Sequence, residues 1–263
     1  MATSNIDQQD PMATVNDNIL EEEETDESAM SLVEHLEELR WRVLKSLIAI
    51  AIGSIVAFIF RERILIFLTY ALPKNADMPT HGRLITTGLA EGFTVFLKLS
   101  LAVGFLIALP VILYQVWAFI SPGLFEREKK NAVPFIIIGL VLFVAGISLG
   151  FIVLQYPVVW LINFAADSFT PLVTADSYFT FTVFFLLAFG IVFEIPLVLT
   201  FLAQIGLVTS QLLRRKRPVA YIGMWVAATF VTPGADPYSP IILGVAMTFL
   251  YELTIVFIRI TNH

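Results

Sequence analysis

The residues of this chain that suggest chemistry are acids placed at the ends of apolar helices. Glu37 and Glu38 lie in residues 31–42, where leucines at positions 32, 36 and 39 predict one apolar face of a helix. Glu126 and Glu128 follow the Ser-Pro-Gly sequence at positions 121–123, which is expected to end another apolar helix. Four acids at one membrane surface would form an anionic patch. Its best ligand is a pair of guanidiniums, because the planar fork of arginine can bond a carboxylate at two points.

A structural explanation of residues 31–42 stays open beside this one. The acids then form a solvated helix face, and the arginines that follow anchor the helix at the membrane surface while their stems cover apolar atoms. The acids at 126 and 128 stand beside Arg127, Lys129 and Lys130. Anchoring of a helix at the inner membrane surface requires only the basic residues, so it does not account for the two acids.

Glu194 is a carboxylate in an otherwise apolar stretch, expected to span the membrane from about residue 178 to 204. An ionised group at that depth costs roughly 2.5–3.5 kcal/mol, so Glu194 is a candidate functional residue. Pro196 frees the carbonyl of Val192 and is expected to kink the helix. The alternative is a protonated Glu194 that hydrogen-bonds a neighbouring helix.

Other candidate residues have plainer explanations. Glu252 precedes Arg259 by seven residues, on the same helix face near the inner boundary, which favours structural anchoring over a binding role. Asp236 is expected to form a turn. Pro110 and Pro157 are expected to bend or end their helices.

Catalysis and metal binding are not expected. The chain has no cysteine and only three histidines, which excludes disulfides and thiolate sites and argues against a histidine-rich metal site. The motifs GxGxxG, GxxxxGK[ST], HExxH and GxSxG are absent. We therefore expect no catalytic residue, no metal and no cofactor.

The elements that must position these acids are membrane-spanning helices. Of the residues, 57% are hydrophobic and only 14% are charged, too few to cover a water-soluble protein of this size. The predicted fold is an all-α polytopic membrane protein with six spans. These are residues 43–60, 99–120, one span within 131–166 that ends near Pro157, then 178–204, 218–232 and 240–260.

The distribution of Lys and Arg predicts the orientation. With the N-terminus inside, the inner segments hold eleven bases, whereas the outer segments hold Arg61, Arg63, Lys74, Arg83 and the border residue Lys98. Both termini are therefore expected in the cytoplasm. In the first outer connection, residues 64–68 predict a helix that lies at the interface. Its apolar run is about half the length that a span needs.

The first thirty residues differ from the rest. They hold nine acids and no Lys or Arg, which leaves 13 acids and all 16 bases for the remainder. Residues 1–30 are expected to be a disordered acidic tail, and residues 31–263 the membrane domain.

Six stretches together resemble the TatC family of twin-arginine, or Sec-independent, protein translocases. They occur in the family's order and cover about residues 31–260. The stretches are His35-Leu36-Glu37-Glu38-Leu39-Arg40, Pro110 to Trp117 with Glu128 beyond it, Phe189 to Pro196, Lys216-Arg217-Pro218, Thr232-Pro233 with Asp236, and Tyr251-Glu252.

The resemblance implies a concave, glove-like bundle that binds twin-arginine signal peptides of folded precursor proteins at the cytoplasmic face. It implies small single-span partners of the TatA and TatB type, self-association in a receptor complex, export driven by the proton-motive force, and no nucleic acid partner. Glu38 and Glu128 would meet the arginines of the signal, Arg40 would hold the helix before the first span, and Glu194 would face the groove. Glu126 has no clear counterpart in the family. The implied location is the bacterial inner membrane, or a cyanobacterial or plastid thylakoid membrane.

Two other functions stay open from the residues alone. A proton-coupled transporter of small solutes would use Glu194 as its proton carrier, but needs more polar groups at mid-depth. A passive membrane scaffold would explain the apolar faces but not the acids at one surface.

Overall fold

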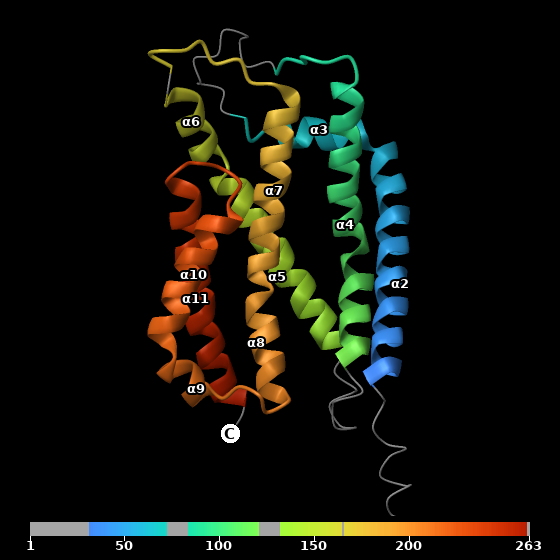
Figure 1. The fold of residues 1–263 in the computed structure, drawn as a ribbon, viewed down its shortest axis with the longest axis vertical. Helices are drawn as coiled ribbons and strands as arrows, with labels where there is room; N and C mark the ends of the chain where they lie inside the picture. The colour runs from blue at the N-terminus through green and yellow to red at the C-terminus, as the bar shows by residue number, and fades with distance from the viewer. Residues whose placement is uncertain (1–31, 73–83, 121–131, 165, 262–263) are drawn as a thin grey trace, which may run out of the picture. The chain divides into compact units, whose positions relative to one another are not determined.

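A computed structural model describes residues 32–72, 84–120, 132–164 and 166–261, which are almost entirely helical (Figure 1). The chain divides into two units, residues 1–44 and 45–263, and each is described by itself. In the first unit the described residues are the beginning of helix α2 (Leu32–Ile59), which continues into the second unit. The acidic tail, residues 1–30, lies outside the described residues.

Five stretches of the described residues are long and apolar enough to cross a membrane. They are α2, α4 (Glu91–Ile120), α5 (Ala132–Val153) with α6 (Gln155–Asn163), α7 (Ala175–Phe193) with α8 (Ile195–Gln204), and α11 (Tyr238–Thr261). The prediction of an all-α membrane protein is confirmed, and five of the six expected spans are present.

The sixth expected span corresponds to α10 (Arg217–Val231), which has only 15 residues. At 1.5 Å per residue it is about 22 Å long, against a hydrocarbon core of about 30 Å. It begins after the short helix α9 (Ser210–Arg215) and packs against α11. A sixth crossing, and the orientation of the termini, therefore stay predictions.

Proline breaks two of the spans and leaves a third continuous. The helix stops at Leu154 and resumes as α6, so the third span continues past Pro157 to Asn163 instead of ending near that proline. The fourth span is interrupted at Glu194, and Pro196 lies in the first turn of α8, as expected of a residue without an amide hydrogen. Pro110 lies inside α4 and does not end it.

Glycines allow α5 and α7 to pack closely. A Cβ atom added to Gly146 of α5 would lie 2.6 Å from the carbonyl oxygen of Phe189, and one added to Gly150 would lie 3.1 Å from the Cβ of Phe189. Gly146 and Gly150 form a GxxxG pair, which typically brings two membrane helices together. Phe189 is fully buried and lies 4.8 Å, between ring centroids, from Phe185 one turn earlier. Phe185 and Phe189 belong to the largest described cluster of buried apolar residues.

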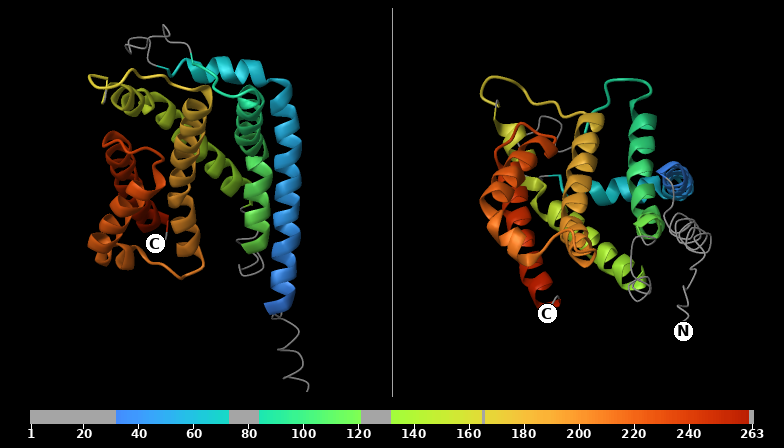
Figure 2. Two further views of the ribbon diagram at one scale, coloured as in Figure 1. Left: turned by 45° about the horizontal axis from the view of Figure 1, so that its top comes forward. Right: turned by 60° about the horizontal axis from the view of Figure 1, so that its bottom comes forward.

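One end of the second unit carries the connections after the first span, and we call it the α3 end. Helix α3 (Arg61–Thr69) runs across the end of α4 and contacts it (Figure 2). The helix expected at residues 64–68 is therefore present. Ile85 forms a parallel bridge with Thr174, just before α7, in which the amide of Ala175 donates to the carbonyl of Ile85 at 2.8 Å. The starts of α4 and α7 are thus tied together.

Candidate functional site

Glu38 is held by its own helix. Its Oε1 accepts hydrogen bonds from Arg42, from Nε at 2.9 Å and from Nη2. A spacing of four places the two side chains on neighbouring turns. Its Oε2 is buried, lies 3.7 Å from Nδ1 of His35, and has no hydrogen-bond partner in the described part of the chain. One carboxylate oxygen is thus engaged by an arginine, while the other has only the more distant His35 beside it among the described residues.

The structure describes only some of the other residues of the expected anionic patch. Glu37 and Arg40 lie on the same helix and are exposed. Glu126 and Glu128 lie outside the described residues, so their approach to Glu38 remains a prediction. Arg42, treated in the sequence as an anchor, is the partner of Glu38.

Glu194 occupies the break between α7 and α8. Both of its carboxylate oxygens are buried, and neither has a hydrogen-bond partner among the described residues. A hydrogen bond from Glu194 to a neighbouring helix, the alternative raised from the sequence, is therefore not present in this part of the chain. A polar group that is buried without a partner destabilises the folded state, so a helix position that keeps one invites a functional explanation.

A glycine of α5 makes room for this carboxylate. A Cβ atom added to Gly139 would lie 3.3 Å from Oε2 of Glu194. The same atom would lie 2.9 Å from Leu113 of α4 and 3.0 Å from Leu197 of α8. Apart from the carboxylate, the atoms nearest to this position are therefore apolar.

Glu252, for which the sequence favoured anchoring over a binding role, pairs with residues of another helix. Its Oε2 pairs with Nη2 of Arg217, and its Oε1 accepts a hydrogen bond from the hydroxyl of Tyr221. Both partners belong to α10, whereas the base noted in the sequence was Arg259 of its own helix. The pair joins α10 to α11 at the end where α10 begins.

Asp236 caps α11. Its Oδ1 accepts from the amide of Ser239 at 2.7 Å, and its Oδ2 from the hydroxyl of Ser239 at 2.6 Å. Asp236 and Ser239 are both buried. The expected turn is confirmed, and the capped amide is one of those that a helix start otherwise leaves unpaired.

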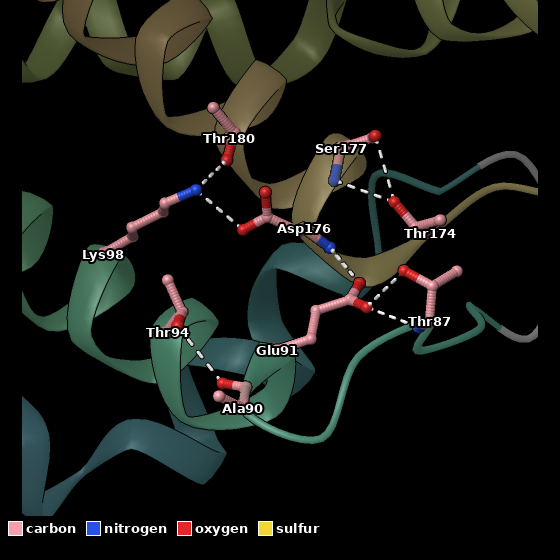
Figure 3. Close-up of polar contacts among 9 residues, drawn as sticks. All are labelled: Thr87, Ala90, Glu91, Thr94, Lys98, Thr174, Asp176, Ser177 and Thr180. Atoms are coloured by element: carbon pink, nitrogen blue, oxygen red, sulfur yellow. Dashed lines mark hydrogen bonds and ion pairs between the residues drawn. The ribbon is translucent and has the colours of Figure 1, made fainter.

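A polar cluster at the α3 end was not singled out in the sequence (Figure 3). Glu91, in the first turn of α4, accepts with Oε2 from the amides of Thr87 and Gly88 and with Oε1 from the amide of Asp176 at 3.1 Å. Lys98, two turns further along α4, donates to Oδ1 of Asp176 at 2.7 Å and to the hydroxyl of Thr180 at 3.0 Å. One carboxylate thus caps the starts of both α4 and α7.

The sequence contained a signal for part of this cluster. The acid at position 91 follows Thr87 and Gly88 by four and three residues, a spacing that lets a glutamate reach back to the amides at the start of its own helix. The link from Glu91 to Asp176 could not be expected, because it joins segments that are 85 positions apart.

The chain matches one known protein family over most of its length. The family described as Sec-independent protein translocase protein (TatC) matches residues 34–245. The chain belongs to the TatC family. A TatC protein of Desulforapulum autotrophicum is 38% identical over 236 residues, which cover 89% of this chain and 86% of the relative. One of Aquifex aeolicus is 35% identical over 229 residues, covering 86% of this chain and 93% of the relative.

A solved TatC structure has the same fold. The crystal structure of the twin arginine translocase receptor TatC superposes with a TM-score of 0.73 at 34% identity, over 88% of this chain and 100% of the other. The TatC family supplies a non-enzymatic subunit of the Sec-independent protein translocase, so the resemblance drawn from the six stretches is confirmed. The chain is a multi-pass integral membrane protein of the bacterial inner membrane, and the small-solute transporter is the less supported alternative.

Proposed function

We propose that this chain is the TatC subunit that binds the twin-arginine signal peptides of folded precursor proteins at the cytoplasmic face. In support, a relative of the same fold is described as the twin arginine translocase receptor. Assembly with small single-span subunits of the TatA and TatB type, self-association in a receptor complex, and export driven by the proton-motive force belong to the same proposal.

The observation that carries this proposal is that the two carboxylate oxygens of Glu38 are paired unequally. One oxygen of its carboxylate is held by Arg42, and the other is buried without a hydrogen-bond donor in the described part of the chain. A guanidinium from the signal supplies the missing donor, either beside Arg42 or in its place. Carboxylate and guanidinium match in shape as well as charge, whereas a lysine ammonium acts as a point charge.

The remaining acids complete the proposed site. Glu128, assisted by Glu37 or Glu126, takes the second arginine, and Arg40 holds the helix that precedes the first span. A partly exposed pair of this kind is worth about 1–3 kcal/mol, at most about a hundredfold in affinity. The apolar stretch of the signal must therefore add binding of its own along the membrane helices.

Glu194 has a separate part in the proposal. It offers a polar contact within the membrane to the inserted signal hairpin or to a helix of a partner subunit. Its two buried oxygens have no donor among the described residues, which supports this assignment, because a donor from an incoming helix would remove the energetic penalty of burying them.

The test is crosslinking of the purified full chain to a twin-arginine signal peptide and to its Lys-Lys variant. We expect a photo-reactive group next to the arginine pair to label residues 31–42 and 121–130, and the Lys-Lys peptide to label them less. The variant Glu62→Gln, an exposed acid of α3, is the matched control and should label as the native chain does. Equal labelling by both peptides would contradict recognition of the arginine pair at this surface.

A further inference from the structure

A groove lies between α6 and the start of α11, and none of the described residues that line it belongs to the proposed signal site. Its volume is about 670 Å³. It is lined by Gln155, Tyr156, Val159, Trp160, Asn163, Phe164 and Tyr238. Helix α6 lies toward the α3 end (Figure 1), where the third span finishes.

The lining residues of α6 form two parallel rows along one face. Gln155, Val159 and Asn163 are spaced by four residues and form the first row, since residues four apart lie one above the other on a helix. Tyr156, Trp160 and Phe164 form the second row, and the rings of Trp160 and Phe164 lie 4.7 Å apart. The amides of Gln155 and Asn163 are about 12 Å apart along the helix, at 1.5 Å per residue. Tyr238, at the start of α11, also lines the groove.

The polar groups of this groove are uncharged and unused. None of the seven described residues that line it carries a charge. Each amide can donate and accept, yet in the described part of the chain no side-chain hydrogen bond involves Gln155 or Asn163. Both side chains are exposed at the end of an apolar span.

This set of groups selects among polar ligands. A phosphate or sulfate needs a cationic donor, and an ammonium needs an acid or aromatic faces that surround it, whereas the aromatic residues of α6 and its end form a single row here. A ring of hydroxyls needs neither, because hydroxyls both donate and accept and can pair with amides, while the apolar face of a sugar ring packs on an aromatic side chain.

We propose that this groove binds the uncharged sugar headgroup of a membrane glycolipid. The lipid, rather than a free sugar, is the occupant because the second row continues toward the membrane with the exposed Ile152, four residues before Tyr156, and Leu161 is exposed beside it. The acyl chains lie along these apolar residues, and the headgroup lies between the amides and Tyr238.

The alternative is an aromatic belt without a ligand. Tyr and Trp are common at membrane interfaces whatever the lipid. A belt of this kind shows no preference for one headgroup, and its amides can be replaced without effect on lipid binding.

The experiment is native mass spectrometry of the purified full chain in a polyoxyethylene detergent, which has no sugar of its own. Monoglucosyl diacylglycerol, phosphatidylglycerol and phosphatidylethanolamine with the same acyl chains are added at equal concentration. We expect the glucosyl lipid to bind roughly tenfold better than either phospholipid, as two neutral hydrogen bonds allow. Dodecyl maltoside, which carries a sugar headgroup, should displace it.

A double variant and a control test whether the glucosyl lipid binds in this groove. Gln155→Met with Asn163→Leu keeps the size of both side chains and should abolish the preference. The matched control Gln204→Met changes an amide of α8 outside the groove and should keep it. Equal binding of the three lipids, a preference for either phospholipid, or a preference that survives in the double variant would overturn the proposal. Because the maltoside competition uses the native chain, it tests the site even if the double variant fails to fold.

Discussion

Nζ of Lys98 lies 2.7 Å from Oδ1 of Asp176, although the two residues are 78 positions apart. Lys98 belongs to α4 and Asp176 to the first turn of α7, so the ion pair joins two spans at the α3 end. The amide of Asp176 also donates to Glu91 of α4. Together with the bridge between Ile85 and Thr174, these contacts fix where α7 begins relative to α4.

Loss of this ion pair should loosen the α3 end. Each side chain is about 40% exposed, so Lys98→Met should lower the free energy of unfolding by only about 1 kcal/mol. Thermal unfolding of the purified chain measures this. Arg214→Met removes an exposed base of α9 that has no ion pair among the described residues, and it should leave the stability unchanged. The reversed pair Lys98→Asp with Asp176→Lys should recover part of the loss; no recovery would mean that charge pairing is not the cause.

The contact between α5 and α7 gives a larger expected effect. Gly146→Ala would place a methyl group 2.6 Å from the carbonyl oxygen of Phe189, and backbone atoms cannot move aside as a flexible side chain can. We expect a loss of about 1–3 kcal/mol in the free energy of unfolding.

The control for Gly146 is Gly223 of α10. An added Cβ atom there has nothing within 4 Å, so Gly223→Ala should not lower the stability and should raise it by about 0.5–1 kcal/mol, since alanine favours a helix over glycine. Equal effects of the two substitutions in thermal unfolding would show that the two helices separate easily and that close packing at Gly146 is not required.

How much of this arrangement could be predicted depends on whether a feature is local. The span at residues 99–120, the capping turn of Asp236 and the break before Pro196 are local, because apolar length, turn chemistry and the missing proline amide each act within a few residues. The partner of Lys98 depends on which helices become neighbours, and a single sequence carries no direct record of that. Glu252 illustrates the limit, because its partner Arg217 lies on another helix and could not be predicted from the spacing of charges along its own helix.

The glycines at which α5 packs on α7 have a recognisable spacing in the sequence. Gly146 and Gly150 form a GxxxG pair that identifies a helix contact without naming the partner helix. The approach of Glu194 to Gly139 of α5 could not be predicted, since it joins two helices that are far apart in the sequence.

The topology of the chain has a direct test. The native chain has no cysteine, so single cysteines can be placed without background. With the N-terminus in the cytoplasm, an impermeant thiol reagent added outside should label a cysteine at Asp167 and not one at Ser121 or Gln211. Labelling at Gln211 would contradict six spans with both termini inside, and with them the cytoplasmic position of the signal site.

Glu194 should show opposite effects on stability and on export. Glu194→Gln keeps the shape and removes the charge, whereas Glu194→Ala removes both. Because the carboxylate is buried without a partner among the described residues, both variants should unfold at the same or a higher temperature than the native chain. If the carboxylate is used in transport, both should lose export of a twin-arginine precursor into membrane vesicles while signal binding persists.

Two outcomes would remove that assignment. Full export by Glu194→Gln would show that the charge and proton exchange at this position are not needed. Loss of export together with a lower unfolding temperature would point to a structural role, in which Glu194 finds a partner within the assembled protein.

The signal site allows the most direct prediction, because Glu38 already shows what an arginine does there. Arg42 engages Oε1 of Glu38 and leaves Oε2 without a donor in the described part of the chain. Glu38→Gln removes the negative charge and replaces one of the two acceptor oxygens with an NH2 group, which cannot accept from a guanidinium. We therefore expect signal peptide binding to weaken by about tenfold to a hundredfold. Glu128→Gln should act in the same direction, and neither variant should lower the unfolding temperature by more than a few degrees, since each keeps the size of the side chain that it replaces.

The decisive measurement combines both substitutions with two peptides. Binding of the Arg-Arg and Lys-Lys peptides is measured by titration with the native chain and with the double variant Glu38→Gln, Glu128→Gln. The native chain should prefer Arg-Arg, because only a guanidinium bonds a carboxylate at two points. Added salt should weaken the binding, though less than for fully exposed charges, since Oε2 of Glu38 is buried. In the double variant the preference should shrink toward equality while the apolar stretch of each peptide still binds. A double variant that discriminates the two peptides as well as the native chain does would place the recognition of the arginine pair elsewhere on the protein.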